Sequence, residues 1–294
     1  MPNASLRSLL PEIVDYAGFF PPAGLELGVA VDNFARYLEG PHAWMLGRLV
    51  VPAGGIEMVR EVSAPRRTTW RLSAVVGDTD VDAIRAVLEA VAGFNEGDDS
   101  IVVDMVEVKA GDEHAIAAIA ASVPPRTRVF VEIPSDPDPA PLVRAIADAR
   151  LRAKIRTGGV TADAFPDAEN VARFIRACYA AGVAFKATAG LHHPLRGEQA
   201  LTYAADSPRG VMHGFLNVFL AAVFCYNGLG AGDALQLLDV TDAGEFGFDD
   251  DGVSWRDYRV STAEIETVRR RLAVSFGSCS FTEPVDDLKS FNLL

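Results

Sequence analysis

Eight short stretches rich in β-forming residues alternate with stretches of helical periodicity, and this alternation constrains the fold more than any other feature of the chain. The strand-like stretches are residues 14–20, 47–53, 70–77, 104–110, 128–134, 152–159, 184–190 and 275–281. Apolar residues recur at helical spacing in several of the intervening stretches, which include 80–94, 113–123, 140–150 and 168–182. Strands that alternate with helices form parallel sheets. Eight such units predict a (β/α)₈ barrel of the TIM-barrel class, with residues 1–294 as a single domain.

An open, doubly wound sheet is the alternative architecture for this pattern. The dinucleotide-binding form of that fold carries a Gly-x-Gly-x-x-Gly turn after an early strand, and no such turn is present. The sequence therefore favours the barrel, and we expect no cofactor.

A long insertion, residues 191–274, separates the seventh and eighth predicted strands. It contains an apolar segment typical of a buried helix (211–228), a hairpin pattern (245–260) and a further helix (262–274). The DDDG segment at 249–252 lacks the alternating ligands and distal Glu of a calcium loop, so we interpret it as the hairpin turn. Because barrel enzymes carry their sites at the carboxyl ends of the strands, we expect the insertion to be a lid or a subunit contact of a homo-oligomer.

The charge balance narrows the classes of partner. Asp and Glu number 40 against 27 Lys and Arg, and the net charge of −13 disfavours nucleic acids and anionic membranes. The N-terminus lacks a signal-peptide pattern, and the apolar run 211–226 is shorter than the roughly 18–20 residues of a spanning helix. Cys178, Cys225 and Cys279 are widely spaced and suggest neither disulfides nor a metal site. We expect a cytoplasmic protein that binds neither nucleic acid nor membrane.

Charged residues occupy alternate positions in the fourth to seventh predicted strands. Strand side chains alternate between the helix layer and the barrel interior. If the apolar residues face the helices, the interior receives Glu107, Lys109, Glu132, Lys154, Arg156 and Lys186. Barrel interiors are normally filled by branched apolar residues, and buried charges are costly unless they are paired or functional. The pattern predicts a functional site, with an ion-pair network that fills the barrel as the alternative.

Lys154 and Lys186 are separated by one strand–helix–strand unit, which places them on adjacent strands. A lysine among other cations in a desolvated pocket has a depressed pKa, and its neutral amine forms a Schiff base with a carbonyl carbon. A nearby carboxylate can transfer protons, and Glu107 is predicted to face the same interior. We therefore expect Lys154, Lys186 and Glu107 to be catalytic residues acting on a small-molecule carbonyl substrate.

The segments around these lysines resemble those of the deoxyribose-phosphate aldolases, a family of class I aldolases that form lysine Schiff bases. KIRTG (154–158) is similar to their Lys-x-x-Thr-Gly segment, and FKATAGLH (185–192) is similar to their Phe/Val-Lys-x-x-Gly-Gly-x-Arg strand. VDMV (103–106), VE (131–132) and FGSCS (276–280) resemble, in the same order, two further strands and the phosphate-binding segment of the family. The resemblance covers most of the barrel but not the insertion.

This resemblance implies a barrel in which Lys154 forms the Schiff base and Lys186 lowers its pKa. For the proton relay the motif match favours Asp104, whereas strand alternation turns Glu107 inward and puts Asp104 on the face of Val106 and Val108. We therefore select Glu107. The substrate-binding residues expected from the interior pattern and the motifs are Lys109, Glu132, Arg156, Thr157, Gly158, Thr188, Gly190, His192, Gly277, Ser278, Cys279 and Ser280.

The chain departs from the family at the phosphate-binding positions. Ala189 and His192 stand where the family has Gly and Arg, and Cys279 replaces a serine. Loss of the arginine removes a strong phosphate partner. We therefore expect a carbon–carbon lyase that acts on a different aldehyde or keto substrate, and the sequence leaves open whether this substrate carries a phosphate.

Two other functions are compatible with the same residues. His192 and His193, with the inward carboxylates, could support metal-assisted chemistry, although consecutive histidines point in different directions and we assign no metal. Alternatively, Lys109, Lys154, Arg156 and Lys186 could bind a small anionic ligand in a barrel without catalysis. The segment DYAGFFPPAG (15–24) either lines the mouth of the pocket or closes the end of the barrel.

Overall fold

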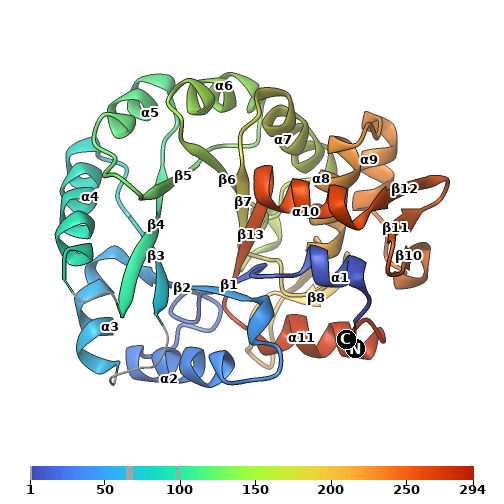
Figure 1. Ribbon diagram of the computed structural model, residues 1–294, viewed down its shortest axis with the longest axis horizontal. Helices are drawn as coiled ribbons and strands as arrows, with labels where there is room; N and C mark the ends of the chain where they lie inside the picture. The colour runs from blue at the N-terminus through green and yellow to red at the C-terminus, as the bar shows by residue number, and fades with distance from the viewer. Residues whose placement is uncertain (1, 64–68, 98–99) are drawn as a thin grey trace.

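The computed structural model describes residues 2–63, 69–97 and 100–294, and its centre is a closed barrel of eight parallel strands (Figure 1). The strands are β1 (Val14–Tyr16), β2 (Leu46–Pro52), β3 (Trp70–Val75), β4 (Ile101–Lys109), β5 (Arg128–Glu132), β6 (Arg152–Arg156), β7 (Phe185–Thr188) and β13 (Ala273–Ser278). They pair in the order β1-β13-β7-β6-β5-β4-β3-β2, and every pairing is parallel. The predicted (β/α)₈ barrel is confirmed.

Helices surround the barrel and bury the outward faces of its strands (Figure 1). They are α2 (Leu27–Leu38), α3 (Ile56–Val62), α4 (Val81–Asn95), α5 (Glu113–Ala120), α6 (Ala140–Asp148), α7 (Ala168–Ala181), α8 (Phe215–Tyr226) and α11 (Thr282–Ser290), with the short α1 (Ala4–Leu9) near the N-terminus. Val106, Val131 and Ile155 face this layer and are fully buried, as strand alternation predicts.

Aspartate side chains fix where three of these helices begin. Asp80, Asp112 and Asp167 precede α4, α5 and α7, and each accepts a hydrogen bond from a backbone N–H of the first turn. Such caps satisfy N–H groups that have no partner within the helix, and each typically contributes about 1 kcal/mol. The strand-to-helix connections are therefore specified locally.

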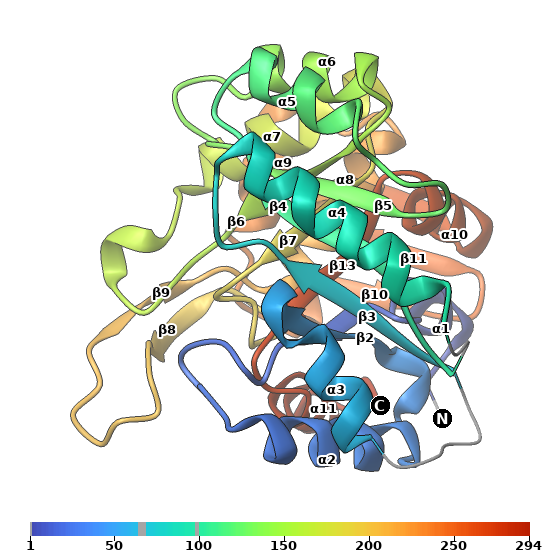
Figure 2. The same cartoon turned by 90° about the vertical axis from the view of Figure 1, so that its left-hand side faces the viewer.

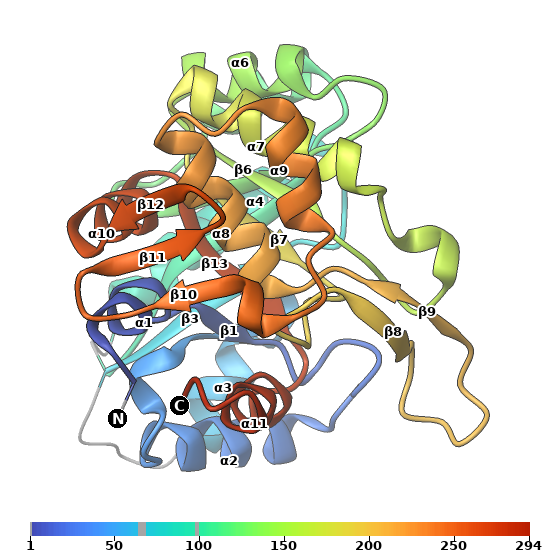
Figure 3. The ribbon, with the colours of Figure 1, turned by 90° about the vertical axis from the view of Figure 1, so that its right-hand side faces the viewer.

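The connection from β7 to β13 has two structurally different parts. First, β8 (Gly197–Ala200) and β9 (Arg209–Met212) form an antiparallel ribbon that projects from the carboxyl end of the barrel (Figure 2). The second part packs against the side of the barrel (Figure 3). It consists of α8, α9 (Ala231–Leu238), the antiparallel sheet β10 (Phe246–Phe248), β11 (Gly252–Trp255) and β12 (Tyr258–Ser261), and α10 (Thr262–Arg271).

The predicted buried helix and hairpin are present in this insertion, with different boundaries. The helix begins at Phe215, after Gly214, because Val211 and Met212 belong to β9. The hairpin gains a third strand, β12, and α10 ends at Arg271, so that the last residues predicted as helix belong to β13. None of the helices in the described ranges is long and apolar enough to cross a membrane.

Candidate active site

A cavity of about 690 Å³ lies at the carboxyl ends of the barrel strands. Its floor and inner wall carry the charged side chains of Glu107, Lys109, Glu132, Lys154 and Arg156, which the alternation argument assigned to the interior. Its outer wall is formed by the loop 20–22 after β1 and by residues 199–203 of the β8–β9 ribbon. The segment 15–24 thus contributes to the pocket mouth, and within the insertion it is the ribbon that takes the position expected of a lid.

Lys154 lies at the bottom of this cavity between two carboxylates. Its Nζ is 2.8 Å from Glu107 Oε2 and 2.9 Å from Glu132 Oε2. The three residues come from adjacent strands, and Glu132 pairs in register with both Lys154 on β6 and Lys109 on β4. The register of the sheet therefore brings these charges together.

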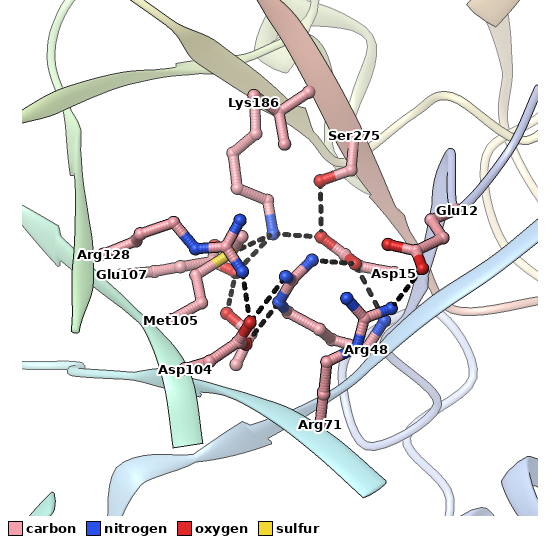
Figure 4. Close-up of polar contacts among 12 residues, drawn as sticks. Glu12, Asp15, Arg48, Arg71, Asp104, Met105, Glu107, Arg128, Lys186 and Ser275 are labelled. Carbon is pink, nitrogen blue, oxygen red and sulfur yellow. Dashed lines mark hydrogen bonds and ion pairs between the residues drawn. The ribbon is translucent and has the colours of Figure 1, made fainter. Parts of the chain in front are cut away.

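Lys186 pairs in register with Lys154 and is fully buried. Figure 4 shows its polar contacts. Its Nζ is 2.6 Å from Glu107 Oε1 and 2.8 Å from Asp15 Oδ2. Ser73 donates a hydrogen bond to the same Glu107 oxygen, and Ser275 donates one to Asp15, both at 2.6 Å. Glu107 thus bridges the two lysines, whereas Lys186 is not among the residues that line the cavity.

The network continues below Lys186, away from the cavity (Figure 4). Arg48 forms a bidentate pair with Asp104, at 2.6 and 2.7 Å, and its backbone N–H donates to Asp15 at 2.9 Å. Arg128 forms a further pair with Asp104. Asp104 therefore contacts two arginines and neither lysine, so the geometry favours Glu107, as alternation did, over Asp104 as the proton relay.

A bulge in β4 explains the position of Asp104. Leu72 pairs with Val103 and Ser73 with Met105, which leaves Asp104 as an extra residue in the strand. Strict alternation placed Asp104 on the face of Val106 and Val108, and this assignment is wrong because the bulge turns its carboxylate toward Arg48.

The charges shift the pKa values of the central pair in opposite directions. Burial opposes ionisation of Glu107, but the ammonium groups of Lys154 and Lys186 outweigh it and hold the pKa of Glu107 well below its usual value of 4.5. Burial likewise disfavours charge on Lys154, yet Glu107 and Glu132 raise its pKa above 10.5. The expectation that Lys186 would depress the pKa of Lys154 is thus wrong, because a carboxylate lies between the two ammonium groups.

Lys109 and Arg156 form the rim of the site, with side chains about half exposed. Arg156 Nε is 3.1 Å from Glu132 Oε1, and Lys109 Nζ is 3.8 Å from the same oxygen. These two cations share a carboxylate that also neutralises Lys154. They are therefore available to an anionic group of a ligand.

Several residues taken from the family motifs have structural contacts instead of direct access to the cavity. Thr157 donates to the carbonyl oxygens of Thr188 and Ala189, at 3.1 and 2.7 Å. Ser278 accepts from the backbone N–H of Ser280, whose own hydroxyl accepts from the N–H of Glu283 at the start of α11. Thr157, Ser278 and Ser280 are not among the residues that line the cavity, and their assignment to substrate binding stays a prediction.

The remaining predicted binding residues, Gly158, Thr188, Gly190, His192, Gly277 and Cys279, do line the cavity. At Gly158 and Gly190 the close approach is to the ring of Phe165, which a Cβ at either position would overlap. Gly190 also has φ +73°, a conformation that favours glycine. Both glycines are therefore required for packing of the cavity wall.

The two consecutive histidines diverge, as expected. His192 Nδ1 lies 2.8 Å from Glu283 Oε2, and His193 Nδ1 lies 2.6 Å from Asp287 Oδ2. Glu107 and Glu132 point instead at Lys154. Within residues 2–63, 69–97 and 100–294, no three His, Cys, Asp or Glu side chains are grouped so that they could hold a metal ion. The geometry gives the metal-assisted hypothesis no support.

Sequence reasoning missed several residues of the site. Four of them are polar residues of the other barrel strands: Asp15 on β1, Arg48 on β2, Ser73 on β3 and Ser275 on β13. Alternation applied to β1 would have assigned Asp15 to the face opposite that of its neighbours Val14 and Tyr16. Tyr203 comes from the turn of the β8–β9 ribbon, and Glu283 from the first turn of α11. No pattern in the sequence indicates that these last two approach the cavity.

Comparisons with known proteins identify no relative: no protein-family model, no curated protein and no solved structure matches this chain. The fold and the site geometry are therefore the basis for any functional conclusion.

Proposed function

We propose that this protein is a lyase of the class I aldolase type, in which Lys154 forms a Schiff base with a small aldehyde or ketone. The observation that carries the proposal is the different access of the two interior lysines. Lys154 lines the cavity and its Nζ contacts two carboxylates, whereas Lys186 does not line the cavity and is paired with Glu107 in the interior. A nucleophile must reach the substrate, which Lys154 can do. A residue that only influences the nucleophile does not need such access, and Lys186 fits that role.

The proposed reaction begins with loss of a proton from the Lys154 ammonium group. Glu107 and Glu132 lie within 3 Å of Nζ and are the acceptors available in the site. The neutral amine attacks the carbonyl carbon, the carboxylic acid returns its proton, the carbonyl oxygen leaves as water, and a protonated C=N bond forms. A carboxylate then takes the proton of the substrate's β-hydroxyl group, the C–C bond breaks, one fragment leaves as an aldehyde, and the electron pair of the broken bond moves toward the imine to give an enamine. The carboxylic acid gives this proton to the enamine carbon, and water hydrolyses the imine to release the second fragment and regenerate Lys154.

Glu107 is suited to this relay because its two oxygens contact different lysines. When Lys154 becomes neutral, Lys186 still balances the Glu107 charge through the 2.6 Å contact to Oε1. The second oxygen, Oε2, is then free to hold and return a proton beside the new C=N bond. Lys186 is in this view a positioning residue for Glu107.

The rim suggests which substrates the cavity accepts. Lys109 and Arg156 would bind a carboxylate or similar anionic group, while Val50, Val75 and Val76 provide an apolar wall. At the positions where the resembled family binds phosphate, Glu283 adds a negative charge. This arrangement favours a carbonyl compound without a phosphate group at that end of the cavity.

Reductive trapping tests the proposal directly, because the chain contains only four lysines, Lys109, Lys154, Lys186 and Lys289. Purified protein is incubated with pyruvate, acetaldehyde or glyceraldehyde and sodium borohydride, and the adducts are mapped by peptide mass spectrometry. We expect a stoichiometric adduct at Lys154 with at least one of these compounds. The adduct should be absent from Lys154→Arg and retained at Lys154 in the matched control Lys289→Arg.

Labelling confined to the exposed lysines, or none at all, would refute the Schiff-base mechanism. The second candidate function is ligand binding without catalysis, and the observation that favours it is the pair of half-exposed cations, Lys109 and Arg156, at the rim. In that case a small carboxylate should raise the Tm equally in the wild type and in Lys154→Arg. Lys186 is too deeply buried to contribute to such a site.

A further inference from the structure

A second cluster of reactive side chains lies on the wall of the same cavity. Cys279 Sγ is 3.8 Å from His192 Nε2, and the other ring nitrogen of His192, Nδ1, is 2.8 Å from Glu283 Oε2. Tyr203 Oη is 3.0 Å from the same Glu283 oxygen and 3.6 Å from Cys279 Sγ. Cys279, His192, Tyr203 and Glu283 all line the cavity.

We propose that Cys279 is a nucleophile, assisted by His192 and oriented through Glu283, that adds reversibly to the carbonyl carbon of an aldehyde bound in this cavity. This function is independent of the Schiff base at Lys154. It gives the cavity a thiol nucleophile in addition to an amine.

The geometry of the three residues is that of an activated nucleophile. Cys279 directly follows β13 and His192 lies just beyond the end of β7, and these are neighbouring strands of the barrel. Glu283 in the first turn of α11 accepts from Nδ1 of the imidazole, which leaves Nε2 directed at the sulfur. The backbone therefore holds thiol, imidazole and carboxylate in the order that nucleophilic catalysis requires.

The electrostatics of His192 agree with this role. Burial disfavours its charge, but Cys279 and Glu283 outweigh burial and raise the pKa of His192 to about 9. A protonated imidazole beside the sulfur stabilises the negative charge that forms on the sulfur when the thiol loses its proton.

The proposed step is balanced within the site. The thiol proton moves from Sγ to His192 Nε2, and Sγ forms a bond to the aldehyde carbon. The π bond of the carbonyl breaks, its electron pair moves to oxygen, and the oxygen takes the proton from Nε2. The product is a neutral thiohemiacetal, which needs no oxidant and reverses by the same path.

The other two cysteines provide internal controls. Cys178 in α7 and Cys225 in α8 are buried in the helix layer and do not line the cavity. Burial raises the pKa of the Cys178 thiol well above its ordinary value and, only partly opposed by Arg176, raises that of Cys225 to about 11. A reagent that tests thiol reactivity should therefore distinguish Cys279 from both in one sample.

The first test is alkylation with iodoacetamide at pH 7, followed by mapping of all three cysteines. We expect Cys279 to react at least about tenfold faster in the wild type than in His192→Gln, with Cys178 and Cys225 unmodified while the protein is folded. His193→Gln is the matched control, because His193 pairs with Asp287, and it should leave the rate unchanged. Circular dichroism establishes that each variant is folded. Glu283→Gln is a second variant that should slow alkylation, although the Glu283 side chain reaches Cys279 only through His192 and Tyr203.

The second test uses acetaldehyde as the probe in a Lys154→Arg background, so that failure of the Schiff-base proposal cannot affect the result. Acetaldehyde should protect Cys279 from iodoacetamide at concentrations that leave glutathione in the same solution unprotected. Equal alkylation of Cys279 with and without acetaldehyde, or a rate in His192→Gln equal to that of the wild type, would overturn the proposal.

Discussion

Between the ammonium groups of Lys154 and Lys186 lies the carboxylate of Glu107, which contacts both at 2.8 and 2.6 Å. Ser73 donates a third contact, to the oxygen that Lys186 also contacts, while Lys154 contacts the other oxygen. Buried charges are tolerated when each one is paired, and removal of one partner destabilises the protein because the remaining charge stays buried without compensation. The two lysines share the carboxylate of Glu107, while Glu132 is the second partner of Lys154 and Asp15 that of Lys186.

We predict that Glu107→Gln destabilises the protein by about 3–5 kcal/mol, because it leaves two buried ammonium groups short of a counter-ion. Urea denaturation followed by circular dichroism measures the change. Glu132→Gln is the control, since Lys154 retains Glu107 in that variant, and its loss should be clearly smaller. Equal losses in the two variants would show that the bridge is not the main stabilising contact.

At the scale of single residues, sequence analysis located the charges on β4 to β7, because the apolar residues of these strands alternate strictly. Sequence analysis could not predict the direction of the pKa shifts, since this depends on which carboxylate lies beside which lysine. Asp104 shows the same limit: one extra residue in β4 changes the direction of a side chain, and no local pattern marks the bulge.

Among the elements, the parts of the insertion differ in how far the sequence specifies them. α8 is apolar in almost all its positions and buried almost throughout, and it was predicted as a buried helix from this apolar run. Apart from the buried Met212, the strands of the β8–β9 ribbon alternate between exposed and half-exposed residues, so they lack the apolar period that marks a strand. The element that closes the cavity was therefore the one that could not be predicted.

Asn217 connects α8 to α9 and to the start of the β8–β9 ribbon. Its amide nitrogen donates to the carbonyl oxygens of Leu237 and Val240, both at 2.9 Å, and its oxygen accepts from the N–H of Arg196 at 2.9 Å. The side chain is fully buried. One amide thus satisfies three backbone groups from two different segments.

Replacing Asn217 by Leu should cost roughly 3 kcal/mol of unfolding free energy, because three backbone groups in the interior lose a partner. Asn227→Ala, at the other end of α8, removes one partly exposed hydrogen bond to Val223 and should cost less than about 1 kcal/mol. Thermal and urea unfolding of both variants provide the comparison. A loss in Asn217→Leu no larger than in Asn227→Ala would contradict this assignment.

For the whole molecule, the ion-pair network predicts how stability responds to acid. Burial opposes ionisation of Asp104, Glu107 and Glu132, but their Arg and Lys partners lower all three pKa values. A carboxylate with a depressed folded-state pKa contributes stability above its unfolded pKa and loses that contribution as pH falls toward the folded value. The ordinary values are 3.8 for Asp104 and 4.5 for the two glutamates.

We therefore expect the unfolding free energy to fall steeply below about pH 4, as these three carboxylates lose their contribution. Urea titrations at half-unit pH intervals measure this profile. The acid limb should be shallower in Glu107→Gln, which has one depressed carboxylate fewer. A stability that stays constant down to pH 3 would show that the network does not control acid unfolding.

The architecture as a whole was predictable because the order of strands and helices along the chain determines a parallel barrel almost completely. The candidate site was predictable in its inner half, where strand register places the charges. Its outer half is built from loops, the ribbon and α11, whose approach to the cavity is a tertiary event. Tyr203 and Glu283 belong to that half.

This division between inner and outer halves separates the scaffold from the recognition surface. The ribbon stands outside the barrel, and its turn carries Leu201, Thr202 and Tyr203 onto the cavity wall without entering the network below. Residues there can be exchanged while the buried charges keep their partners. For protein engineering, the turn of the ribbon is thus the natural position for a library aimed at new ligand selectivity.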